Sequence, residues 1–324
     1  MILAIETSCD DTCAAVVAND GAVLSNTVSS QGVHDAFGGV VPEVAARRHL
    51  ELIDPVLDQA LRGAGAGLDD ISLVAATRGP GLVGALLVGF SAAKAIAAAR
   101  ELPFAAVDHL RGHVAAALLG PTPLQPPFLS LIASGGHTLL LHVEDPRVLP
   151  RVIFRTLDDA AGEAFDKGAR MLGLGYPGGA ALERLAAAGD PSAFDFPTGR
   201  SEDFSFSGLK TALLYKLREP EAAGRGADLA ASFQHAIVEA LLVRCRLAIG
   251  RTNVRRLAVG GGVAANGVLR SRLAELDVEL SIPPRDLCTD NAAMIAAAAR
   301  LQTPLAYPDY LPLDVYATGE GPLR

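Results

Sequence analysis

The chain opens with MILAIETSCDDTCAAVVANDGAVLSNTV, residues 1–28, and the architecture of the fold can be predicted outward from this stretch. Ile2–Glu6 and Ala14–Ala18 are short apolar runs typical of strands, and a polar turn joins them. The turn signal Asp20-Gly21 leads into a third run, Ala22–Val28. The opening therefore predicts a β-hairpin followed by a third strand.

Beyond this opening, predicted strands alternate with predicted helices. The elements are a helix from Pro42 to about Leu61, strand Ile71–Thr77, helix Gly84–Arg100, strand Phe104–Val107 and helix His109–Leu119. Pro42 suits the first position of a helix, where its missing N–H costs nothing. The alternation predicts parallel βαβ units.

The same pattern returns after the proline-rich segment Gly120–Pro127, which predicts a linker. Three strands are expected again: Phe128–Ala133, His137–Val143 and Val152–Thr156. Then follow helices at Asp158–Leu172, Gly178–Ala188, Ser207–Arg218 and Asp228–Gly250, strand Arg256–Val259, a helix from about Asn266, strand Val278–Ile282 and helix Asp290–Leu301. The repeated pattern predicts two similar α/β halves, which suit a nucleotide-binding clamp. A proline-rich tail is expected to wrap a surface.

The composition limits the possible partners and compartments. The 324 residues are 50% hydrophobic with a formal net charge of −8, which excludes a generally basic nucleic-acid binder but allows a local patch, with Arg47, Arg48 and Arg111 as candidates. Four cysteines without a C-x-x-C pair indicate reduced thiols and a cytoplasmic protein. The first residues lack the basic region of a signal peptide, and Ser91 and Lys94 interrupt the longest apolar stretch, so no membrane segment is expected.

The motif His109-Leu110-Arg111-Gly112-His113 carries the most specific chemistry. Histidines at i and i+4 share one helical face and can bind one metal ion. The zinc-protease pattern H-E-x-x-H has a general-base Glu where Leu110 stands, so a protease is disfavoured. Asp290, in Cys288-Thr289-Asp290-Asn291, could complete a His–His–carboxylate site. In the alternative interpretation, the histidines bind no metal and Thr289 or Asp290 caps the final helix.

Several loops could bind phosphate or a nucleoside. Ser134-Gly135-Gly136-His137-Thr138 lies between two predicted strands and is either an anion-binding loop or a plain hairpin turn. Gly260-Gly261-Gly262 allows close approach of a ligand, and Asn266 could bind a ribose or base. Gly79-Pro80-Gly81-Leu82-Val83-Gly84 fits the dinucleotide fingerprint, with Asp108 as ribose acid, but close packing of a strand and a helix explains the glycines equally well.

The opening turn Glu6-Thr7-Ser8-Cys9-Asp10-Asp11-Thr12 is rich in carboxylates and hydroxyls. Thr7 and Ser8 could contact phosphate, and Asp10 or Asp11 could act as a base or place a cation. Ordinary turn chemistry is the alternative, because Asp, Ser and Thr favour turns.

Taken together, these motifs resemble the universal tRNA threonylcarbamoyltransferase family in its bacterial TsaD branch, whose members were once labelled O-sialoglycoprotein endopeptidases. The motifs occur in order between about Met1 and Ala306: ETSCDDT, HDAFGGVVPEVAARRH, RGPGLVGAL, HLRGH, SGGHT, AGEAFDKGARMLGLGYPGG, FSFSGLKTA, GGGVAANGVLR and CTDNAAMIA. Each is weak alone, but the combination is specific.

The resemblance implies an actin/Hsp70/sugar-kinase-like α/β fold, with two RNase H-like lobes around a central cleft. The expected lobes are 1–120, on which 291–324 packs back, and 121–290. The implied activity is transfer of a threonylcarbamoyl group from threonylcarbamoyl-AMP to N6 of adenosine 37 in tRNAs that read codons beginning with A. The implied partners are a TsaB-like paralogue and a TsaE-like ATPase, with a TsaC-type synthase supplying the intermediate.

The resemblance also implies roles for individual residues. The metal ligands would be His109, His113 and Asp290, binding one divalent ion, iron(II) or alternatively zinc. Asp10 and Asp11 match the acidic pair near the reacting centre, although many relatives carry Glu where Asp11 stands. The implied substrate contacts are Ile132, Ala133, Ser134, Gly135, Gly136, Asp166, Gly179, Glu183 and Asn266. Archaeal and eukaryotic relatives have a tyrosine ligand at the position of Ile132, so its absence suggests the bacterial branch.

Two other classes of protein remain as alternatives. One is an actin-like ATPase or kinase of the same fold, which would use Mg²⁺ and a catalytic Asp on the opening turn of the second lobe. The other is a non-catalytic scaffold subunit of the same fold. Such paralogues usually lack the histidine pair, and this chain has both His109 and His113.

Overall fold

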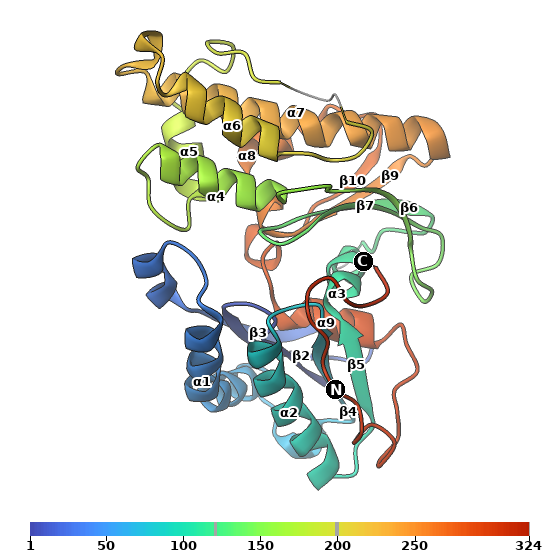
Figure 1. Ribbon diagram of the computed structural model, residues 1–324. Coiled ribbons are helices and arrows are strands. Elements are labelled where there is room, and N and C mark those ends of the chain that lie inside the picture. The colour runs from blue at the N-terminus through green and yellow to red at the C-terminus, as the bar shows by residue number, and fades with distance from the viewer. Residues whose placement is uncertain (120–121, 198–200, 324) are drawn as a thin grey trace. The chain divides into compact units, whose positions relative to one another are not determined.

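The computed structural model describes residues 1–119, 122–197 and 201–323 (Figure 1). The chain divides into two compact units. Unit 1 comprises Met1–Gln125, Asp145–Leu149 and Asp290–Arg324, and unit 2 comprises Pro126–Glu144 and Pro150–Thr289. The expected lobe boundary at residues 120 and 121, within the expected linker, lies outside the described residues.

The sheet of unit 1 has the strand order β3-β2-β1-β4-β5. Its strands are β1 (Ile2–Glu6), β2 (Asp11–Val17), β3 (Val23–Ser30), β4 (Leu73–Gly79) and β5 (Phe104–Asp108). β1 is antiparallel to β2, with Ile2 opposite Val17, and parallel to β4, with Ile2 opposite Leu73. The predicted hairpin opening and the predicted parallel units are both confirmed.

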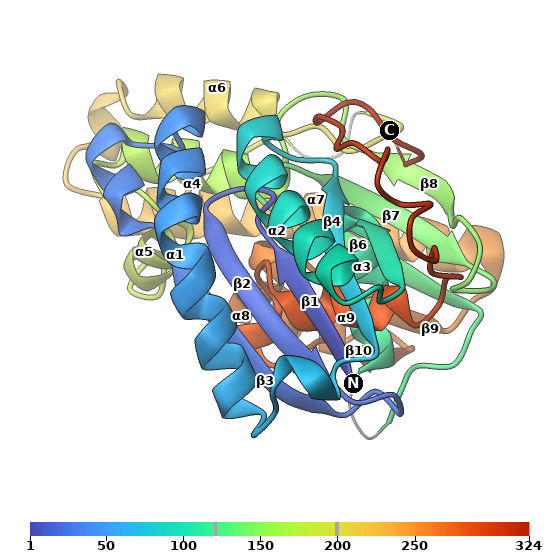
Figure 2. The ribbon, with the colours of Figure 1, turned by 90° about the horizontal axis from the view of Figure 1, so that it is seen from below.

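Helices cover both faces of this sheet. They are α1 (Pro42–Gly63), α2 (Val83–Ala99), α3 (His109–Ala115) and α9 (Ala292–Ala299), with short 3-10 turns at Gly32–Phe37, Leu68–Asp70 and Ala116–Leu118. Successive strand side chains point to opposite faces. Leu3 and Ile5 therefore join the core formed with α1 and α2, whereas Ile2 and Ala4 join the core formed with α9. Figure 2 shows α1 and α2 on one side of this sheet and α9 on the other.

The C-terminal tail packs on unit 1. Leu305 forms a β-bridge with Phe104, and the fully buried ring of Tyr310 lies 5.2 Å from that of Phe104 between centroids. Further along, the hydroxyl of Tyr316 donates a hydrogen bond to Asp108, the last residue of β5. The tail therefore reaches the residue that precedes α3.

Unit 2 repeats the topology with the strand order β10-β9-β6-β7-β8. Its strands are β6 (Phe128–Ala133), β7 (Thr138–Val143), β8 (Arg151–Arg155), β9 (Arg256–Gly260) and β10 (Glu279–Ser281). Its helices are α4 (Ala161–Met171), α5 (Gly179–Ala186), α6 (Ser207–Lys216), α7 (Gly226–Thr252) and α8 (Gly267–Ala274), with 3-10 turns at Pro220–Ala222, Gly262–Ala265 and Arg285–Leu287. β6 is antiparallel to β7 and parallel to β9, as β1 is to β2 and β4. The predicted duplication of the pattern is confirmed.

No helix in the described part of the chain combines the length and the apolar character that crossing a bilayer requires.

Candidate metal centre and substrate loops

Two histidines of α3 project from one face of the helix. The carboxylate of Asp108 caps α3 by accepting a hydrogen bond of 3.0 Å from the N–H of Arg111. A capped N-terminus fixes where the helix begins, and therefore places His109 and His113 one turn apart. Both residues are buried, with 5% and 4% exposure.

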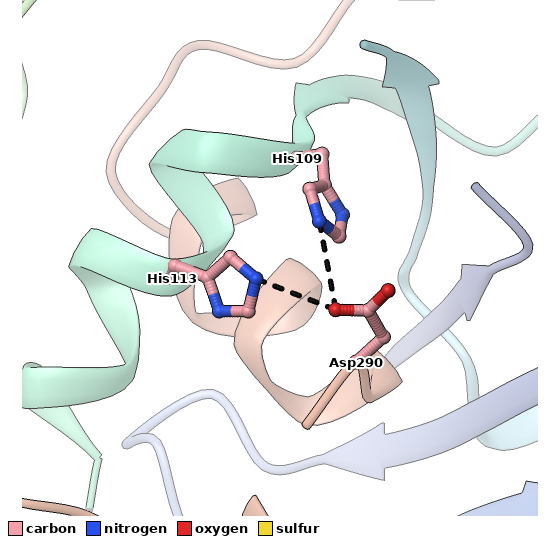
Figure 3. Close-up of side chains that lie close together, drawn as sticks. All are labelled: His109, His113 and Asp290. Atoms are coloured by element: carbon pink, nitrogen blue, oxygen red, sulfur yellow. Dashed lines mark ion pairs between the residues drawn. The ribbon is translucent and has the colours of Figure 1, made fainter. Parts of the chain in front are cut away.

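The start of α9 supplies the third residue of this cluster. Asn291 caps α9 by accepting a hydrogen bond of 3.0 Å from the N–H of Met294. The expectation that Thr289 or Asp290 serves as the cap is therefore wrong: the cap lies one or two residues later, and the carboxylate of Asp290 points toward the histidines (Figure 3).

The three side chains converge closely enough to share one cation. Asp290 Oδ1 lies 3.6 Å from Nε2 of His109 and 3.4 Å from Nε2 of His113 (Figure 3). All three candidate ligand atoms lie within 4.8 Å of one another. Nε2 of His113 is buried without a hydrogen-bond partner among the described residues. A buried nitrogen of this kind is costly unless a ligand satisfies it, so the donor set fits a metal ion.

The far side of the His109 ring meets the opening turn. Nδ1 of His109 lies 2.9 Å from Oε2 of Glu6 and 3.2 Å from the hydroxyl of Ser8. Glu6 is fully buried at the end of β1. Glu6 belongs to the carboxylate-rich opening turn but is not among the individual site residues expected from the sequence. An acidic residue that ends the apolar run ILAI is a signal that could have pointed to it.

The carboxylates of unit 1 shift the pKa values of two groups at this site. Burial by itself lowers the pKa of His109, but the charges of Asp290 and Glu6 outweigh it and raise the pKa to about 9. Burial raises the pKa of Asp11 to about 7; a hydrogen bond from Ser30 opposes this shift, and the charges of Asp290 and Asp10 add to it. The opening turn therefore places Glu6 beside His109 and brings Asp11 into the electrostatic field of Asp290.

Thr7 and Ser8 of the opening turn contact the first turn of α2 and the residue before it. The hydroxyl of Thr7 donates a hydrogen bond of 2.9 Å to the carbonyl of Ala85, and the carbonyl of Ser8 accepts one of 2.9 Å from the N–H of Leu82. A Cβ on Gly81 would lie 2.6 Å from the carbonyl oxygen of Ser8. Close packing therefore explains this glycine of the fingerprint-like motif, and Asp108, the supposed ribose acid, is the cap of α3.

In unit 2, the Ser134–Thr138 segment is the turn between β6 and β7. The Ser134 hydroxyl accepts a hydrogen bond of 3.0 Å from the N–H of His137. The backbones of Gly135 and Gly136 are exposed, neither has a positive φ, and a Cβ on either would meet nothing within 4 Å. The fold itself therefore does not require glycine at these two positions. Ile132 and Ala133, by contrast, are fully buried at the end of β6.

The triple-glycine turn has a partly structural explanation. Gly261 has a φ of +88°, and a Cβ there would lie 2.4 Å from the carbonyl oxygen of Ala133. The close approach of this turn to β6 thus requires glycine at position 261. Gly262 has no such close neighbour, because its nearest contact would be Thr289 at 3.9 Å, and Gly260 is the last residue of β9.

The remaining expected substrate residues line adjoining elements of unit 2. Asp166 accepts a hydrogen bond from the N–H of Gly178, next to Gly179, at 2.8 Å. Glu183 accepts one from the N–H of Gly267 at 2.8 Å. Asn266 caps α8 and donates its amide to Gln234 at 2.8 Å. A cavity of about 520 Å³ between α5, α7 and α8 is lined by residues that include Glu183, Gln234 and Gly267.

Two α/β units with the same sheet topology define the fold class of the protein. The structure is similar to component A of (R)-2-hydroxyglutaryl-CoA dehydratase from Acidaminococcus fermentans, with a TM-score of 0.57 and 17% identity over 92% of this chain and 97% of that chain. The fold is that of the actin/Hsp70/sugar-kinase class, as expected.

Sequence comparison narrows this class to one family. Residues 22–297 match the family described as TsaD: tRNA N6-adenosine threonylcarbamoyltransferase. Proteins of that name from Syntrophobacter fumaroxidans and Trichlorobacter lovleyi are 53% and 50% identical to the chain, over 92% and 98% of its length and 93% and 96% of theirs. The chain belongs to the TsaD family of tRNA N6-adenosine threonylcarbamoyltransferases.

Proposed function

We propose that the chain transfers the threonylcarbamoyl group from threonylcarbamoyl-AMP to N6 of adenosine 37 in tRNAs that read codons beginning with A. Membership of the TsaD family over nearly the whole length is the observation that carries this proposal. The convergence of His109, His113 and Asp290 supports it, because a non-catalytic paralogue would have no need of such a cluster.

His109, His113 and Asp290 would hold one divalent metal ion, with both Nε2 atoms and one carboxylate oxygen as ligands. Imidazole and carboxylate donors suit iron(II), the ion that the family resemblance implies, and also zinc. Bound there, the ion would act as a Lewis acid toward the carbonyl or the phosphate of the mixed anhydride. The buried Nε2 of His113, which has no hydrogen-bond partner among the described residues, supports a cation-binding site.

Asp10 and Asp11 are the proposed acid–base groups. An exocyclic amine is a weak nucleophile, so a base close to the attacking nitrogen and a fixed orientation both matter. Asp11 suits the role of base because a pKa of about 7 allows it to accept a proton at neutral pH. Asp10 contributes negative charge beside it.

Unit 2 carries the proposed contacts to threonylcarbamoyl-AMP. Gly135 and Gly136 are exposed, and the fold does not require glycine at either position. Backbone N–H groups of such a glycine turn would bind an anionic group of the substrate. Glu183 is placed at the wall of a cavity large enough for part of a nucleotide. The proposed set is completed by Ile132, Ala133, Ser134, Asp166, Gly179, Asn266 and the Gly260–Gly262 turn, with Thr7 and Ser8 of unit 1 as further candidates.

The proposed partners follow from the same family. They are tRNA, a TsaB-like paralogue and a TsaE-like ATPase, acting in the cytoplasm. No disulfide joins the four cysteines, all of which the structure describes, and this agrees with a reducing compartment. Arg47 and Arg48 form surface ion pairs with Glu43 and Glu51, whereas Arg111 donates to the carbonyls of Pro146 and Arg147. A tRNA phosphate would have to compete with these contacts.

A transfer assay tests the proposal directly. Purified chain, with the partner proteins, is incubated with threonylcarbamoyl-AMP and unmodified tRNA, and the digested nucleosides are identified by mass spectrometry. We expect threonylcarbamoyladenosine from the wild type and a yield that falls as salt rises, because phosphate contacts weaken with counterion concentration. The proposed activity would be refuted if the complete system with the wild type formed no threonylcarbamoyladenosine and could not be distinguished from the system with His109→Ala.

A further inference from the structure

The carboxylate of Glu6 is the buried acidic group that contacts the proposed ligand His109 from the side opposite Asp290. It is fully buried at the end of β1. Oε1 accepts a hydrogen bond from the N–H of Ser8, and Oε2 accepts one from the hydroxyl of Thr77 and faces Nδ1 of His109 at 2.9 Å. Burying a carboxylate is costly unless donors surround it, and here three donors converge on it.

The contact with Glu6 determines which nitrogen of His109 carries the proton. An ionised carboxylate can only accept hydrogen bonds, so Nδ1 of His109 must be the donor. When a metal ion replaces the proton of Nε2, the ring that remains is neutral, protonated at Nδ1, and has its lone pair on Nε2. Nε2 is the atom that faces Asp290 (Figure 3). The hydrogen bond therefore keeps the proton on Nδ1, leaves Nε2 as the ligating nitrogen and fixes the plane of the ring.

We propose that Glu6 is a positioning residue that fixes the tautomer and orientation of His109 and thereby strengthens metal binding by His109, His113 and Asp290. The inference rests on the metal site proposed above. Histidine ligands commonly donate their second ring N–H to a carboxylate, and loss of that partner weakens metal affinity roughly 10- to 100-fold.

Thr77 provides a matched control for this role. Its hydroxyl donates a hydrogen bond to Oε2 of Glu6, the same oxygen that faces Nδ1 of His109. Thr77 is therefore a neighbour of Glu6 and not a hydrogen-bond partner of His109 in this network. Thr77→Val removes this donor with little change in volume and leaves the Glu6–His109 pair in place. Glu6→Gln keeps the shape of the side chain but replaces one acceptor oxygen by an NH₂ donor.

The test is titration of the metal-free full-length chain with Co²⁺, followed by its visible absorption bands, for the wild type and both variants. We expect Glu6→Gln to bind Co²⁺ roughly 10- to 100-fold more weakly and to show shifted bands at saturation. We expect Thr77→Val to keep the wild-type affinity and bands, even if thermal unfolding shows that it is less stable. Band positions report the ligands themselves, so a loss of stability alone would not move them.

Three results would overturn the inference. Wild-type affinity and bands in Glu6→Gln would show that the contact does not act on the metal. An equal weakening in Thr77→Val would assign the effect to the buried network as a whole. Failure of the wild type to bind Co²⁺ would contradict both the proposed metal site and the inference. If the wild type and Glu6→Gln bind Co²⁺ equally well, only the inference fails and the proposed function stands.

If Glu6→Gln does not fold, NMR of the Zn²⁺-loaded wild type gives the answer without it. We expect His109 to show a slowly exchanging Nδ1–H proton with nitrogen shifts of a ring bound through Nε2, assigned by its loss in His109→Gln. A ring bound through Nδ1, or one without that proton, would contradict the inference.

Discussion

Gly112 in α3 lies directly against Ile295 in α9: a Cβ at position 112 would be 2.8 Å from Cδ1 of Ile295. Gly112 stands between the two histidines in the sequence, and Ile295 lies in the helix that begins just after Asp290. The eight residues of α9, AAMIAAAA, are all buried, and most are alanines. Small residues on both helices thus allow the close approach that places Asp290 beside His109 and His113.

Gly112→Val is expected to separate α3 from α9. Overpacking of a tight contact costs about 1–3 kcal/mol, and the displaced α3 should also bind metal more weakly. Gly208→Val is the matched control, because a Cβ at Gly208 in α6 meets nothing within 4 Å. Chemical denaturation and metal titration of both variants measure the effects. Equal stability and metal affinity in the two would show that the Gly112–Ile295 contact does not set the site.

His113→Ala should lose bound metal and transfer activity while it keeps the fold. One of three ligands is removed, whereas the small cavity left in α3 should lower stability only moderately. The control is His142→Ala. His142 is also a buried histidine, but it belongs to unit 2 and is not one of the three proposed ligands. Metal content by elemental analysis, with circular dichroism, distinguishes them. Full metal content in His113→Ala would contradict the ligand assignment.

Tyr316→Phe should weaken the support that the C-terminal tail gives to α3. The Tyr316 hydroxyl donates to Asp108, the cap of α3, so its removal should lower the free energy of unfolding by about 1–3 kcal/mol. Tyr307→Phe, at a half-exposed tail position, should be nearly neutral. Urea denaturation of both variants measures the difference. A neutral Tyr316→Phe would show that the tail does not support α3.

Protonation of Asp158 should lower the stability of unit 2 in acid. Partial burial alone would raise its pKa, but hydrogen bonds from the hydroxyls and N–H groups of Ser205, Phe206 and Ser207 outweigh it and lower the pKa. A lowered folded-state pKa gives stability that is present above the unfolded value of about 3.9 and is lost as pH falls through the folded value.

Asp158→Asn therefore should be less stable than wild type near neutral pH, and the difference should shrink as the pH falls below about 4. Denaturant unfolding at a series of pH values measures this difference. A constant gap between the two proteins across the acid range would show that ionisation of Asp158 does not contribute.

Much of the fold could be predicted from local sequence patterns. Ile2–Glu6 and Phe128–Ala133 are apolar runs bounded by turns, and both form strands with the predicted bounds. Pro42 opens α1, as its fixed φ suggests. The end of the helix predicted over His109–Leu119 was less accurate, because α3 ends at Ala115 and continues as a 3-10 turn.

The site was only partly predictable because its geometry depends on contacts between distant segments. The i, i+4 spacing of His109 and His113 indicates one helical face, but no local pattern places Asp290 there. The cap at Asn291 was missed because Thr289, Asp290 and Asn291 are all good cap residues. Glu6 was missed because an acidic residue at a strand end is indistinguishable from turn chemistry until the burial of its side chain is known.

Nucleoside mass spectrometry of tRNA from cells depleted of this protein tests the central claim most directly. The account predicts that threonylcarbamoyladenosine disappears and that wild-type protein restores it, whereas His109→Ala, expressed to the same level, does not. Unchanged modification in depleted cells would contradict the proposed function and favour an actin-like ATPase or a scaffold of the same fold.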